Sequence, residues 1–72
     1  MTPESLNALL APTYLPTPLT WTPWPERAGW WQAPIGRNAY EVGKLLMHAD
    51  HSLRYEVIQD RGTPRALLVG PR

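Results

Sequence analysis

The sequence predicts a small single-domain α+β protein, a three-stranded sheet with one main helix. Apolar residues recur at helical spacing over residues 42–49, and they alternate over 52–60 before an apolar run at 67–69. The chain has 72 residues and no cysteine, so its one core must form without disulfides. We expect a short helix over 2–11, an ordered proline-rich arm over 12–27 and a β-α-β-β unit over 28–72.

The first segment predicts a short helix. Thr2 is a good N-cap, and Pro3 suits the first helical position. Pro12 ends the helix, because the residue before a proline avoids helical backbone. One apolar stripe follows from the i, i+3, i+4 spacing of Leu6, Leu9 and Leu10.

The arm over 12–27 combines five prolines with aromatic bulk. The prolines exclude a helix and a central strand and favour extended backbone. The segment is too apolar for a solvated linker, so we expect it to lie ordered on the domain surface. The apolar members that argue for this are Tyr14, Leu15, Leu19, Trp21 and Trp24.

Residues 28–33 predict a short first strand, closed by Pro34. Its neighbours Trp30 and Trp31 must point to opposite faces of the sheet. Since tryptophan buries a large area, we expect both rings mostly in the core. Trp21 or Trp24 is then the ring left exposed for a partner.

The clearest helix follows. Asn38 and Glu41 have capping-box spacing. Ala39 and Gly43 lie four residues apart beside the apolar stripe, which leaves a shallow place for a large ring. Gly43→Leu should therefore destabilise the protein far more than helix propensity predicts. The stripe itself consists of Val42, Leu45, Leu46 and Ala49.

The last segment predicts a β-hairpin with its turn at Gly62. Leu53, Tyr55 and Val57 alternate on one face, and the return strand over 65–70 contains an unbroken apolar run. That run suits a strand buried on both faces, so we place it centrally, in a split β-α-β arrangement. The main helix covers one sheet face. The N-terminal helix and the arm are expected to cover the other, where Ile58, Leu67 and Val69 would need them.

The sequence contains no convincing catalytic set, so we expect a non-enzymatic protein without cofactors. Asp50, His51 and Ser52 have the residue types of a hydrolase triad, but adjacency in the chain does not give triad geometry. His48 and His51 lack the further ligands that a metal site needs, so no metal is expected. The simpler structural role for both histidines is to donate hydrogen bonds to the free carbonyls at the end of the helix.

The absence of cysteine fits a reducing cytosol, so we expect a cytoplasmic protein, and we expect no membrane segment. No stretch approaches the roughly 20 apolar residues of a membrane span, and no signal peptide is visible. The net charge is +1, but from Arg61 onward there are three arginines and no acid: Arg61, Arg65 and Arg72. Such an end is a weak indication of an anionic partner.

The leading hypothesis is a small non-catalytic protein-binding module, an accessory or inhibitory protein of viral or mobile-element type that occupies a surface of a larger partner. Tryptophan and arginine are enriched at protein–protein hot spots. A nucleic-acid binder using the C-terminal arginines with Trp30 and Trp31 is the alternative, and a structural subunit or homo-oligomer remains open. The partner-binding residues expected are Trp21, Trp24, Arg27, Arg61 and Arg65.

Overall fold

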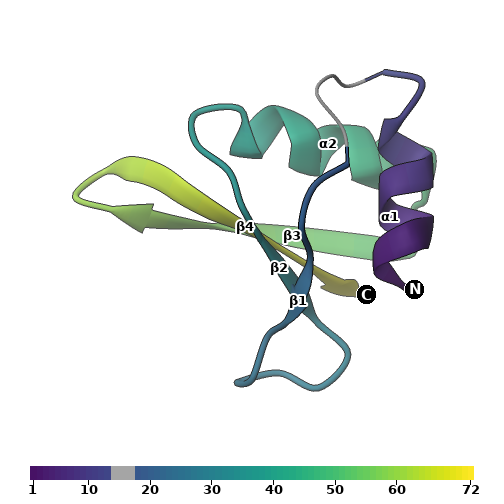
Figure 1. Cartoon of the computed structure of the whole chain (residues 1–72), viewed down its shortest axis with the longest axis horizontal. Helices are drawn as coiled ribbons and strands as arrows, with labels where there is room; N and C mark the ends of the chain where they lie inside the picture. Colours follow the sequence, from purple (N-terminus) through teal and green to yellow (C-terminus); the bar gives the residue numbers. More distant parts are fainter. Residues whose placement is uncertain (14–17) are drawn as a thin grey trace.

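Two helices and one sheet form an α+β fold in the computed structural model, which describes residues 1–13 and 18–72 (Figure 1). Within these residues, one four-stranded antiparallel sheet with strand order β1-β2-β4-β3 packs beneath two helices. The α+β class is confirmed, but the count of three strands is wrong. Tyr14, Leu15 and Pro16 of the predicted arm lie outside the described residues. The elements are α1 (Pro3–Leu10), β1 (Thr22–Pro23), β2 (Trp31–Pro34), α2 (Ala39–Ala49), β3 (Leu53–Asp60) and β4 (Thr63–Pro71).

The additional strand, β1, lies inside the predicted arm. Thr22 pairs with Gln32 and Pro23 with Trp31. Prolines exclude a central strand but are tolerated at a sheet edge, where one side of the strand needs no donor. Among the described residues of the arm, Thr22 and Pro23 are thus extended as expected and join the sheet, whereas residues 12–13 and 25–27 form turns or bends.

Strand β2 starts later than the sequence predicts, at Trp31 instead of residue 28. The preceding residues form a tight turn, in which the Trp30 amide donates to the Arg27 carbonyl at 3.2 Å. Gly29 has a φ of 84°, a left-handed conformation that suits glycine. The backbone therefore cannot extend until it has passed this turn.

The central position of β4 is confirmed. It pairs with β2 on one side and with β3 on the other, both antiparallel, so that β2 and β3 run parallel to each other. The consecutive residues 66–70 are all buried. The unbroken apolar run of the sequence therefore reflects burial on both faces.

Both helices lie on the same face of the sheet, which corrects the expectation that α1 covers the opposite one. Leu6 and Leu10 of α1 are fully buried in the same cluster as Val42 and Leu46 of α2. Leu67 and Val69 also face these helices, because their register partners are Val57 and Tyr55. The buried core is completed by Trp21, Ala33, Ala39 and Leu53.

The two helix starts differ from each other. Thr2 caps α1 as predicted, and its side chain accepts from the Ser5 amide at 3.1 Å. Asn38 makes no side-chain capping hydrogen bond, so the predicted capping box with Glu41 is wrong. The turn before α2 already supplies a partner, since the Ala39 amide donates to the Gly36 carbonyl at 2.9 Å.

Gly43 lets α2 pack directly on the sheet. A Cβ built on Gly43 would lie 2.5 Å from Cγ and 2.7 Å from Cε2 of Tyr55. The large ring expected beside Gly43 is therefore that of Tyr55, projecting upward from β3.

The β3–β4 hairpin extends well beyond the helices (Figure 1). Its two-residue loop has a positive φ at both positions, 55° at Arg61 and 81° at Gly62. This is the pattern of a type I′ turn, whose twist matches the flanking strands. Farther along, Arg65 is an extra residue in β4, because Ile58 pairs with Ala66 whereas Gln59 pairs with Pro64.

Within residues 1–13 and 18–72, neither helix has the length and apolar character needed to cross a membrane.

Candidate protein-binding surface

Trp21 is not available to a partner, so the expectation of an exposed ring there is wrong. Its side chain is 6% exposed, and its indole Nε1 donates to Asn7 Oδ1 at 3.0 Å. Asn7 also accepts from the Leu19 amide and donates to the Leu19 carbonyl, each at 3.0 Å. The Asn7 side chain thus holds Leu19 and Trp21, which lie just before β1, against α1.

The other three tryptophans divide between the two sheet faces. Trp31 packs against the helix-side core, together with Trp21. Trp24 and Trp30 are cross-strand neighbours, since the Trp24 amide donates to the Trp30 carbonyl at 2.8 Å, and they share the opposite face. The Trp30 ring occupies the space where a Cβ of Gly70 would be. The expectation that Trp30 joins the core with Trp31 is therefore corrected. Trp24 and Trp30 are each half-buried.

Arg27 is held by contacts within the chain. Its guanidinium lies 4.7 Å from the Trp30 ring centroid, and it binds Glu56 through Nη1–Oε2 at 2.6 Å and Nη2–Oε1 at 3.2 Å. The hydrogen bond to Glu56 raises the pKa of Arg27, and the same bond lowers the pKa of Glu56. With Gly70 against the Trp30 ring and Arg27 over it, this ring offers little surface for stacking on a base.

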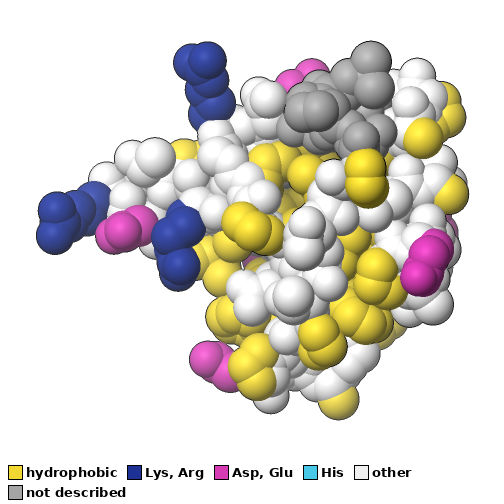
Figure 2. Space-filling model, viewed as in Figure 1, with side chains coloured by type: hydrophobic (Ala, Val, Ile, Leu, Met, Phe, Trp, Pro, Cys, Tyr) yellow, Lys and Arg dark blue, Asp and Glu magenta, His cyan; other side chains and the backbone are white. Residues whose placement is uncertain are grey.

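The three C-terminal arginines do not form one patch. Arg61 and Arg65 are exposed on the projecting hairpin, the end of the molecule where Figure 2 shows basic side chains extending outward. Arg72 lies at the other end of β4, where its Nη1 donates to the His51 carbonyl at 3.1 Å. The length of β4 thus separates Arg72 from Arg61 and Arg65, although all three are close in the sequence.

The segment Asp50–Ser52 forms a turn instead of a nucleophile relay. Asp50 Oδ1 accepts from the Ser52 amide at 2.9 Å and from the Ser52 hydroxyl at 2.6 Å. These hydrogen bonds lower the pKa of Asp50. Because the hydroxyl donates to Asp50, no Ser–His pair is formed here. In the described part of the chain, no three His, Cys, Asp or Glu side chains are grouped closely enough to hold a metal ion.

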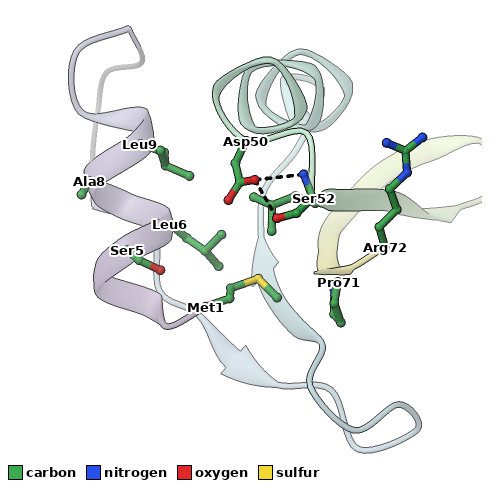
Figure 3. Close-up of a pocket in the computed structure, with 10 residues that line it drawn as sticks. Met1, Ser5, Leu6, Ala8, Leu9, Asp50, Ser52, Pro71 and Arg72 are labelled. Atoms are coloured by element: carbon green, nitrogen blue, oxygen red, sulfur yellow. Dashed lines mark hydrogen bonds between the residues drawn. The ribbon is translucent and has the colours of Figure 1, made fainter.

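A cavity of about 620 Å³ lies between α1 and the adjoining ends of β3 and β4 (Figure 3). Its walls are mainly apolar, and its polar side chains already bind one another or the backbone: Ser5, Asp50, Ser52 and Arg72. The cavity therefore offers apolar contact and little directed chemistry.

The β1 edge of the sheet is closed to further strands. The Trp24–Trp30 hydrogen bond shows that residues 22 and 24 direct their backbone groups toward β2. Pro23 therefore faces outward, and it has no N–H to donate. A two-residue strand with proline at its outer position cannot template another strand.

The β3 edge is open. The Arg72 amide donates to the Ser52 carbonyl at 2.8 Å, so Ser52 and alternate residues after it direct their backbone groups toward β4. Tyr55 and Val57 then direct both N–H and C=O away from the sheet. No strand among residues 1–13 and 18–72 pairs with β3 on that side.

Helix α2 forms one wall beside this edge. Gln59 near the end of β3 donates to the Tyr40 hydroxyl, and Met47 lies beside Leu53 and Tyr55, so α2 runs antiparallel to β3. Tyr40 and Met47 are 42% and 39% exposed, two of the large apolar side chains that the described structure leaves in solvent.

Two hollows meet at Met47. One, of about 510 Å³, is lined by Met47, residues 53–55 and Arg72; the other, of about 160 Å³, is lined by Lys44, Met47, His48 and His51. We call the outward backbone of Tyr55 and Val57, together with its wall, the β3-edge surface. The wall has two parts. Its α2 side consists of Tyr40, Lys44, Met47, His48 and the following His51. Its other side chains are Arg54 of β3 and Arg72 after β4.

Comparison of the chain with protein-family models, curated proteins and solved structures gives no match. The functional argument therefore depends on the geometry of the chain itself.

Sequence reasoning missed the β3-edge surface because it looked for distinctive side chains, whereas the feature is backbone. A signal was nevertheless present. Prolines crowd the residues that form β1, and none interrupts 53–60. Once β4 is placed centrally, this contrast distinguishes a closed edge from an open one.

Proposed function

We propose that the protein is a small non-catalytic protein-binding module that receives an extended segment of a larger partner as a fifth strand beside β3. The observation that carries the proposal is the eight-residue β3, whose Tyr55 and Val57 backbone groups point away from the sheet. Addition of a strand at a sheet edge is a common mode of peptide recognition, in which backbone hydrogen bonds supply affinity and neighbouring pockets supply specificity. Met47 and Tyr40 provide the apolar contacts for such specificity.

Among the described residues, the other surfaces support this function less well. Trp21 is buried, Arg27 is ion-paired, and the two exposed arginines of the hairpin stand apart from both. The nucleic-acid alternative requires free stacking rings near the cations, yet Trp30 is already in contact with Gly70 and Arg27.

Val57→Pro tests the proposal, since it removes an outward N–H without touching the β3–β4 ladder. Proline is tolerated at such an edge position, so circular dichroism should show a folded protein. Immobilised wild-type protein should capture a stoichiometric partner from a lysate of its source, and Val57→Pro should lose it. Val57→Ala, which truncates the side chain but keeps the N–H, should retain it.

Capture that survives Val57→Pro would contradict strand addition. If capture were instead lost in the double variant Arg61→Gln/Arg65→Gln, the hairpin tip would be the site. Sedimentation at several concentrations separates the structural-subunit alternative, which predicts self-association that weakens on dilution.

A further inference from the structure

The β3-edge surface is positive. Lys44, Arg54 and Arg72 are permanent cations, and His48 and His51 lie between them along the wall. Neither of the two hollows is lined by an Asp or Glu among the described residues. For a chain with a net charge of +1, this is a concentration of one sign on one surface.

Four carboxylates belong to neighbouring parts of α2 and β3, and none of them lines either hollow: Glu41, Asp50, Glu56 and Asp60. Asp50 lines the cavity beside α1 and accepts two hydrogen bonds from Ser52. Glu56 points to the sheet face opposite α2 and is held by Arg27. After its hydrogen bond from Arg27, the nearby charge of Arg54 also lowers the pKa of Glu56, and Glu41 lies one turn before Lys44 on α2. The excess of positive charge is therefore confined to the linings of the two hollows that meet at Met47.

The spacing of the wall matches an extended chain. Lys44 and His48 are four helical residues apart, which corresponds to about 6 Å along α2. Alternate residues of a strand, which point to the same face, are about 6.6 Å apart. An added strand running beside β3 would thus bring its side chains at i and i+2 next to Lys44 and His48. Arg54 points to the other sheet face and would meet a residue between them.

We infer that the segment received at the β3 edge is acidic, with carboxylates facing Lys44 on the α2 side and Arg54 on the other side, and with apolar contact at Met47. This inference rests on the proposed function and names the chemistry of its partner. It requires the outward backbone of Tyr55 and Val57 to pair with the segment, and Lys44 with Arg54 to favour its charge.

A second copy of this chain fits the surface less well. Antiparallel self-pairing centred on Tyr55 would bring both copies of Lys44, Arg54 and Arg72 to one interface. Like charges brought together oppose association. An acidic segment gains from the same cations.

The test uses labelled peptides of about ten residues, long enough to span β3. Each peptide carries one leucine for the contact at Met47 and threonine elsewhere, except at charged positions on both faces of the strand. Those positions are glutamate in the first peptide, glutamine in the second and lysine in the third. Binding is followed at low and at physiological salt by amide NMR shifts of Tyr55 and Val57. We expect the glutamate peptide to bind about tenfold more tightly than its glutamine isostere, a gap typical of a few exposed ion pairs and smaller at high salt.

Two charge-matched variants localise the effect. Lys44→Gln/Arg54→Gln should abolish most of the preference for glutamate. Arg61→Gln/Arg65→Gln removes the same charge from the hairpin tip and should leave the preference intact. If both pairs lower it equally, the preference comes from net charge and the inference is refuted.

The remaining outcomes separate the two proposals. Equal affinity for the glutamate and glutamine peptides, with shifts at Tyr55 and Val57, refutes the acidic segment and leaves strand addition standing. Strand addition itself is refuted if no peptide shifts these amides at a peptide concentration of about 1 mM, which detects a binding free energy of about 4 kcal/mol. Tighter binding of oligothymidylate at the same amides would assign the surface to nucleic acid. Dimerisation that shifts these amides without any peptide would assign it to a second copy.

Discussion

Gly43→Ala should destabilise the protein, although the same change in an exposed helix is favourable by about 1 kcal/mol. The added Cβ would lie 2.5 Å from Cγ and 2.7 Å from Cε2 of Tyr55, where ordinary contact needs more than 3.4 Å. Either α2 or the ring must therefore retreat by almost 1 Å. Overpacking of this kind costs typically about 1–3 kcal/mol, and three ring carbons are affected, so we take the upper end. The net loss is then about 2 kcal/mol.

Urea and thermal unfolding followed by circular dichroism measure this loss. For a domain of this size, 2 kcal/mol corresponds to a fall in Tm of about 8–16 °C. Gly36→Ala is the matched control, because no atom lies within 4 Å of the position that its added Cβ would take, and it should leave Tm unchanged or slightly raised. In a Tyr55→Ala background, Gly43→Ala should become neutral or stabilising. A Gly43→Ala variant as stable as Gly36→Ala would refute the contact between α2 and the Tyr55 ring.

Two further predictions concern stability. Asn7→Ala leaves the Trp21 indole and the Leu19 amide without an acceptor and the Leu19 carbonyl without a donor. It should therefore cost about 2–4 kcal/mol in urea unfolding and shift tryptophan emission to the red. An alanine variant within about 1 kcal/mol of wild type would contradict the role given to Asn7. Arg61→Asn should raise the free energy of unfolding by about 0.5–1 kcal/mol, because asparagine adopts the left-handed backbone observed there with less strain. The control Arg65→Asn should show no such gain. An unchanged Tm for Arg61→Asn would mean that the turn is not strained.

The layers of the fold follow from the sequence because periodicity reports burial. The alternation of Leu53, Tyr55 and Val57 predicts β3, and the unbroken run around Leu68 predicts a central β4. Both expectations are confirmed, and so is the ring beside Gly43. Each depends on local pattern and on the short connection between the two strands.

The positions of the tryptophans did not follow from the sequence. Which face a residue of β1 or β2 takes depends on register, and register here is set by the Gly29 turn. A shift of the register by one residue would exchange the two faces. The observed register places Trp21 on the core face and Trp30 on the opposite face. The cations of the β3-edge surface were also beyond prediction, since the surface joins the exposed side of α2 to residues at the open end of the hairpin, where β3 begins and β4 ends.

The outward-facing Pro23 has a consequence for assembly size. A sheet that accepts neighbours at both edges can polymerise without limit, as fibrils do. Here the described sheet can lengthen at β3 alone, so two copies joined there would present a proline-bearing margin at each end. Self-association through the sheet would therefore stop at a pair. A bound segment, in contrast, would be held at a ratio of one to one.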